Sequence, residues 1–141
     1  MRKSPINKQT IALQNKTSEC GKLADFLTAF INSNDISGEI HNDLRLVLEE
    51  AFINVVTYAY SKEKNHSVTI EFIHSVNSIS ITFTDTGIAF NPLTDCDTSI
   101  ETDDHCEGGM GIHIIKSLTD QQEYDRIEQR NVFTVTKHYT K

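Results

Sequence analysis

The chain has 141 residues, of which 38% are hydrophobic and 23% charged, and its formal net charge at pH 7 is −7. This length suits one domain with its own hydrophobic core. The acidic balance argues against a nucleic-acid partner, which would be held through its phosphates. The chain contains neither an apolar run long enough to cross a membrane nor a signal-peptide core, so we expect a cytoplasmic protein that is not bound to a membrane. Three cysteines, an odd number, fit reduced thiols better than a disulfide framework.

The N-terminal half reads as one strand followed by two helices. Residues 8–14 contain a short apolar run that predicts an edge strand. A helix is expected after the N-cap candidate Thr17, because apolar residues then recur three and four positions apart. After a polar break, the same spacing predicts a second, longer helix that begins at Ser37 or Gly38 and runs through Tyr60.

The middle of the chain carries the most regular pattern. Residues 68–73 and 79–84 alternate between apolar and polar side chains, which predicts a β-hairpin with one face on a core. Residues 91–107 are polar and acidic without any periodicity, and their length is typical of a functional lid.

The C-terminal part is expected to hold one helix, beginning at the glycine-rich segment 108–111, and then strands at 123–127 and 132–139. Strands grouped in this order favour an α+β fold, a two-layer α/β sandwich. We expect a mixed, mostly antiparallel sheet with the helices on one face. Residues 1–141 should form a single domain.

Two polar positions stand out on the long second helix. Glu50 and Asn54 are one turn apart, at the edge of the apolar stripe, where a carboxylate and an amide can reach a cleft. Taken alone, such a pair is more typical of a solvated helix face.

Asp85 and Gly87 follow a predicted strand, where a carboxylate can accept a hydrogen bond from an exocyclic amine while the backbone turns under a flat ring. Taken alone, this tripeptide is more typical of a simple turn.

The glycine-rich segment 108–111 would place free backbone amides at a helix N-terminus, which is a common way to bind phosphate. The alternative is a loop hinge with a helix cap. The segment is not a Walker loop, because no Gly-Lys-Ser/Thr follows it. Acidic residues, cysteines and a histidine occur within residues 95–106, but their spacing fits neither a calcium loop nor a zinc site.

Taken together, these stretches resemble the nucleotide-binding domain of DNA gyrase, large heat-shock chaperones, sensor histidine kinases and MutL. Residues 50–54 look like the N-box, residues 85–90 like the adenine-binding G1 box, and residues 108–111 like the G2 box. Within that group the chain is most similar to the bacterial anti-sigma-factor serine/threonine kinases. The resemblance covers nearly the whole chain and implies a Bergerat-type fold that uses ATP and Mg²⁺.

The resemblance also implies roles for single residues. Glu50 would be the general base, Asn54 a ligand of Mg²⁺ and an ATP contact, Asp85 the partner of the adenine amine, and Gly87 the floor under the ring. Further ATP-binding residues implied in this way are Ala89, Phe90, Gly108, Gly109, Met110, Gly111 and Thr134. Thr134 would support Asp85 through a water molecule.

The chain departs from the family pattern in three respects. Many members have histidine where Tyr58 stands, and Ala89 replaces a glycine of the wider group. No Lys or Arg occurs from residue 65 to residue 115, so Mg²⁺ and backbone amides would have to balance the phosphate charge, with Lys62, Lys64 or Lys116 from the flanks as further candidates.

The expected function is therefore that of an ATP-dependent serine/threonine protein kinase that acts as an anti-sigma factor. The resemblance implies an anti-anti-sigma (antagonist) protein as substrate and a sigma factor as sequestered client, and it also allows a homodimer. Two alternatives belong to other classes: a non-catalytic module that binds a partner in an ATP-dependent way, and an ATP hydrolase of the gyrase or MutL type. Glu50 argues against the first.

Overall fold

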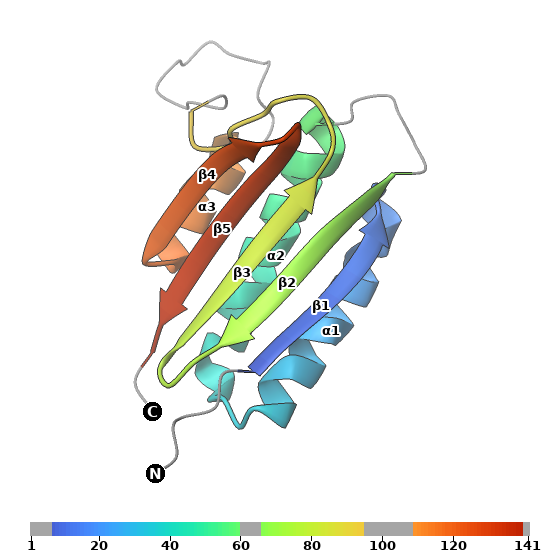
Figure 1. Ribbon diagram of the computed structural model, residues 1–141. Helices are drawn as coiled ribbons and strands as arrows, with labels where there is room; N and C mark the ends of the chain where they lie inside the picture. Colours follow the sequence, from blue (N-terminus) through green and yellow to red (C-terminus); the bar gives the residue numbers. More distant parts are fainter. Residues whose placement is uncertain (1–6, 60–65, 95–108, 140–141) are drawn as a thin grey trace.

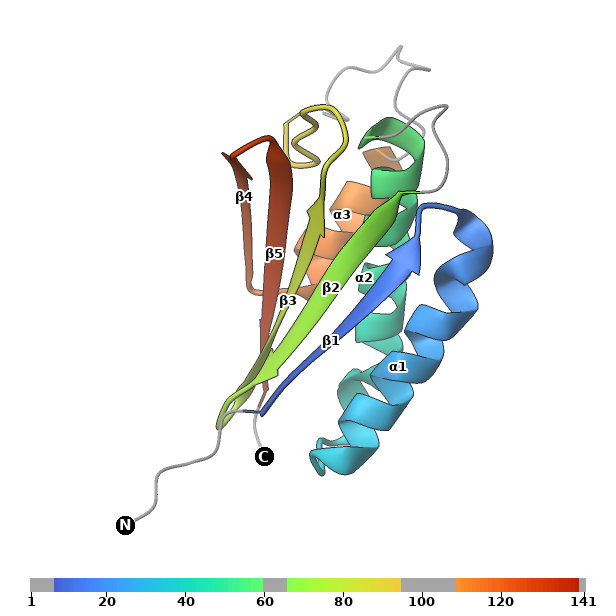
Figure 2. The same ribbon diagram turned by 45° about the vertical axis from the view of Figure 1, so that its right-hand side comes forward.

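The computed structural model describes residues 7–59, 66–94 and 109–139. They form two layers, a five-stranded sheet and a layer of three α-helices on one of its faces (Figures 1 and 2). The strands are β1 (Asn7–Gln14), β2 (Ser67–His74), β3 (Ser78–Asp85), β4 (Gln121–Ile127) and β5 (Arg130–His138). The α-helices are α1 (Cys20–Ser33), α2 (His41–Asn54) and α3 (Gly109–Leu118). Short 3-10 helices at Thr17–Glu19 and Gly38–Ile40 precede α1 and α2.

The sheet has the strand order β1-β2-β3-β5-β4, and each neighbouring pair is antiparallel. The expected α+β sandwich with helices on one face is confirmed. The expected parallel component of the sheet is wrong for the described strands. β3 and β4, on either side of α3 in the sequence, run in the same direction, but β5 lies between them and pairs antiparallel with both.

The two faces of the sheet differ in chemistry, as the alternation predicted. Fully buried apolar side chains of β2 and β3 face the helices: Val68, Ile70, Phe72, Ile79, Ile81 and Phe83. Hydroxyl groups pair across the strands on the other face, where Thr82 Oγ1 lies 2.9 Å from Thr134 Oγ1. Burying one apolar face against the helices is the main stabilising contribution of such a fold.

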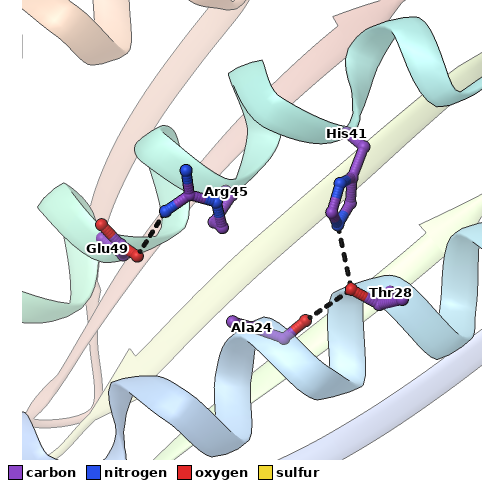
Figure 3. Close-up of polar contacts among 5 residues, drawn as sticks. All are labelled: Ala24, Thr28, His41, Arg45 and Glu49. Atoms are coloured by element: carbon purple, nitrogen blue, oxygen red, sulfur yellow. Dashed lines mark hydrogen bonds and ion pairs between the residues drawn. The ribbon is translucent and has the colours of Figure 1, made fainter.

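Helix α2 contacts both other helices, and α1 and α3 lie on either side of it (Figure 2). The 3-10 helix that leads into α2 is capped by Ser37, whose side chain accepts a hydrogen bond from the Glu39 amide. A polar contact joins it to α1: His41 Nε2 lies 2.9 Å from Thr28 Oγ1 (Figure 3). The central position of α2 makes it the element on which the candidate site is built.

The end of α2 differs from the prediction. The α-helix stops at Asn54 and continues as a π-helical turn, Val55–Ala59, while Tyr60 lies outside the described residues. In this wider turn the Ala59 carbonyl oxygen accepts a hydrogen bond from the Ile88 amide, 2.9 Å away. π-turns inside helices occur frequently at functional sites.

Most of the expected lid lies outside the described residues, as does Gly108. The described start of that loop is a turn, in which the Leu93 amide donates to Asn91 Oδ1 over 2.9 Å. None of the helices in the described part of the chain is both long and apolar enough to span a membrane.

Candidate functional site

Asn54 is the most unusual polar residue of the described structure. Its side chain is 2% exposed, yet neither Oδ1 nor Nδ2 has a hydrogen-bond partner among the described residues. Leaving a buried polar group unsatisfied costs about 1–3 kcal/mol, so such groups usually have a function. An amide oxygen is a normal ligand of Mg²⁺, which prefers oxygen donors. Asn54 therefore fits the metal-ligand role that the family resemblance implies.

Glu50 lies one turn before Asn54 and is half-buried. Its neighbour Glu49 forms an ion pair with Arg45 at 3.1 Å (Figure 3). Glu50 itself has no hydrogen bond or ion pair with any other described residue. Of the two adjacent carboxylates, Glu50 is thus the one available to accept a proton.

Helix α3 reaches the Glu50 carboxylate through a glycine. A Cβ atom built on Gly111 would lie 2.3 Å from Glu50 Oε1, far closer than atoms can approach. Glycine at this position therefore leaves the space that the carboxylate occupies. Because α3 begins at Gly109, the amides of its first turn are free to bind an anionic group close to Glu50.

Asp85 ends β3 on the helix-facing side of the sheet and is 3% exposed. Its Oδ1 accepts hydrogen bonds from the Gly87 amide (2.8 Å) and from Asn131 Nδ2 (2.9 Å), and Oδ2 has no partner among the described residues. Burial raises the pKa of Asp85, and these two hydrogen bonds and the positive charge of Arg126 offset part of that effect. The free oxygen can accept a hydrogen bond from a ligand amine.

The turn after β3 is seated directly on the end of the central helix. A Cβ atom on Gly87 would lie 2.4 Å from the Ala59 carbonyl oxygen, so only glycine fits this position. The ring of Tyr58 stacks on Phe90, with centroids 4.9 Å apart and an angle of 19° between the planes. These contacts bring the Asp85 turn and the Glu50–Asn54 helix into one site. Ala89 is solvent-exposed beside them.

Asn131 is a site residue that the sequence reasoning missed. It pairs with Asp85 across β3 and β5, and its side chain bridges Asp85 and the Ile88 carbonyl oxygen, 2.8 Å away. The resemblance implies that Thr134 supports Asp85 through a water molecule, but Thr134 lies three residues further along β5 and so on the opposite face of the sheet, bonded to Thr82. The structure brings Asp85 and Asn131 together and keeps Thr134 away from both.

Comparison with known proteins agrees with this geometry. The sequence profile of the family described as "Histidine kinase-like ATPase domain" matches residues 13–137. Serine-protein kinase RsbW of Bacillus subtilis (strain 168) is 30% identical over 88 residues, which are 56% of this chain and 53% of RsbW. The anti-sigma F factor of Oceanobacillus iheyensis is 26% identical over 99 residues, which are 69% of this chain and 68% of that protein.

The chain thus spans about half the length of RsbW and about two thirds of the anti-sigma F factor. Both relatives support the resemblance to anti-sigma-factor kinases that the motifs indicated. The family match includes all the described residues of the site, from Glu50 on α2 to Asn131 on β5. The chain therefore belongs to the histidine kinase-like ATPase domain family.

Proposed function

We propose that this protein is an ATP-dependent serine/threonine protein kinase that acts as an anti-sigma factor. One observation carries the proposal: an unpartnered carboxylate, Glu50, stands one helical turn from Asn54, a buried amide with no hydrogen-bond partner among the described residues. The first supplies an acceptor for a proton, and the second supplies a ligand for Mg²⁺. Glu50 lies beside Gly111 in the first turn of α3, where the phosphates of ATP would find free amides.

The nucleotide would be recognised at the end of β3. The free oxygen of Asp85 accepts a hydrogen bond from the adenine amine, and the Gly87 turn would lie under the ring. Guanine would be disfavoured, because it presents a carbonyl oxygen where adenine presents an amine, and two acceptors would then face each other. The residues Ala89 and Phe90 continue this edge of the site.

The reaction that this arrangement supports is phosphoryl transfer to a protein hydroxyl. The hydroxyl oxygen of a serine or threonine bonds to the γ-phosphorus, the bond to the β–γ bridging oxygen breaks, and ADP leaves. Glu50 accepts the hydroxyl proton. When bound, Mg²⁺ neutralises charge on the phosphates, and Asn54 would hold it. The amides of Gly109, Met110 and Gly111 would contact the phosphates.

The two relatives support the partners in this proposal. One is a serine-protein kinase and the other an anti-sigma F factor. We infer that the chain phosphorylates an antagonist (anti-anti-sigma) protein and sequesters a sigma factor.

The direct test mixes the purified chain with labelled ATP, Mg²⁺ and a purified antagonist-type protein from the same organism. We expect label on a serine or threonine of the antagonist, and none when Mg²⁺ is removed with a chelator. Association with the antagonist without labelling would instead support a non-catalytic binding module. Release of phosphate at the same rate with and without the antagonist would support an ATP hydrolase.

A further inference from the structure

Arg126 of β4 contacts the candidate nucleotide site although it lies in none of the family motifs. Its Nη1 donates hydrogen bonds to the Gly87 carbonyl oxygen over 2.9 Å and to Asn131 Oδ1 over 3.1 Å. Both acceptors are next to Asp85, one in the turn that follows it and one on the neighbouring strand. A single guanidinium group therefore links the edge strand of the sheet to both supports of the carboxylate.

We propose that Arg126 is a positioning residue for nucleotide binding. It holds the Gly87 turn and the Asn131 amide so that Asp85 presents an ionised, correctly directed oxygen to the adenine ring of the nucleotide. This inference deepens the proposed function and rests on it. Arg126 acts through Asp85 and need not touch the nucleotide.

The first part of the argument concerns the orientation of the Asn131 amide. An amide can turn by 180°, and the two orientations exchange its donor and acceptor. The Arg126 guanidinium and the Phe90 amide are donors only, and both point at the same atom of Asn131, Oδ1, to which the Tyr124 hydroxyl also donates. They therefore direct Nδ2 toward Asp85, where it donates over 2.9 Å. Turned the other way, the amide oxygen would face a carboxylate.

The second part concerns charge. Asp85 is nearly sealed from solvent, which disfavours its ionised form. The groups that face it are the Asn131 amide from β5, the Gly87 amide from the turn and the Arg126 charge from β4. Of these, Arg126 is the one that carries a full charge. Burial raises the pKa of Asp85 and Arg126 lowers it, so removing Arg126 raises that pKa further.

The test compares Arg126→Met with a control, Lys137→Met. Both changes remove one positive charge from a strand of the sheet, but Lys137 pairs with Ile79, at the opposite end of β3 from Asp85. The affinity for ADP is measured by calorimetry between about pH 8 and pH 5, a range in which a raised aspartate pKa becomes visible. The ADP affinity of each variant is divided by that of the wild type at the same pH, so that the titration of ADP itself cancels.

At the alkaline end we expect Arg126→Met to bind ADP about three- to tenfold more weakly than the wild type, from the loss of two hydrogen bonds at a partly solvated group. This deficit should widen as the pH falls. A purely structural role would weaken binding by the same factor at all pH values. Arg126→Lys, which keeps the charge, should follow the wild-type pH profile, and Lys137→Met should match the wild type throughout.

Three results would overturn the inference: a ratio for Arg126→Met that does not change with pH, a profile for Arg126→Lys like that of the methionine variant, or equal behaviour of the two methionine variants. Failure of the proposed function would look different. In that case the wild-type chain would bind ADP without transferring phosphate from ATP to the antagonist protein, or would not bind ADP at all.

Discussion

Replacing Gly111 with alanine should separate stability from catalysis. The added Cβ would lie 2.3 Å from Glu50 Oε1, whereas ordinary contacts begin at 3.4 Å, so the carboxylate oxygen must move by about 1 Å. The atom that has to move is the end of a flexible side chain, which makes the movement inexpensive for the fold. Alanine also favours a helix over glycine by up to about 1 kcal/mol. We therefore expect the free energy of unfolding to stay the same or to rise.

Phosphoryl transfer should nevertheless fall by about 100-fold, because a misplacement of about 1 Å costs a rate of that order. The assay is the initial rate of label transfer from ATP to the antagonist protein, with thermal unfolding measured on the same sample. Gly21→Ala is the control: Gly21 is also in the first turn of a helix, and a Cβ there meets nothing within 4 Å. A Gly111→Ala variant that transfers phosphate at the wild-type rate would refute the placement of Glu50.

Three further substitutions follow from the site. Asn54→Leu removes an unsatisfied buried amide, so it should raise the free energy of unfolding, measured by chemical denaturation, by about 1–3 kcal/mol. The same variant should lose Mg²⁺-dependent ATP binding. ATP binding that still responds to Mg²⁺ would contradict the role of Asn54 as a metal ligand. Asp85→Asn should weaken ADP binding about ten- to a hundredfold in calorimetry. Because burial raises the pKa of Asp85, the affinity of the wild type for ADP should fall as the pH is lowered through that pKa. Over the same pH range the contribution of Asp85 to folding stability should rise. The asparagine variant should show neither of these two pH dependences. Thr134→Val should leave ADP affinity unchanged, and a clear loss would show that Thr134 reaches the site after all.

The sequence predicted the parts of the site that depend on spacing within one element. Glu50 and Asn54 share a helix edge because they are four residues apart, and the β2–β3 hairpin follows from strict alternation. Asp85 could be placed at the end of its strand for the same reason. These relations need no knowledge of how the elements pack.

The relations that were missed depend on contacts between distant elements. Asn131 faces Asp85 only because β3 and β5 pair antiparallel in one register, and a shift by one residue would have sent it to the other face of the sheet. No pattern within β5 distinguishes Asn131 from Thr134 as the partner of Asp85. The close approach of Gly87 to Ala59 likewise depends on the π-turn that ends α2, which helical periodicity does not reveal.

The central claim is that Glu50 is the base for phosphoryl transfer, and the most direct test compares Glu50→Gln with Glu49→Gln. The two residues are adjacent on α2, but Glu49 is paired with Arg45 and Glu50 has no partner in the described structure. Transfer of label from ATP to the antagonist protein is measured together with ATP affinity. We predict that Glu50→Gln keeps its ATP affinity within a few-fold of the wild type but transfers phosphate about 10²–10⁴-fold more slowly. Glu49→Gln should keep both the wild-type affinity and the wild-type rate. Transfer at the wild-type rate by the Glu50→Gln variant would contradict the account.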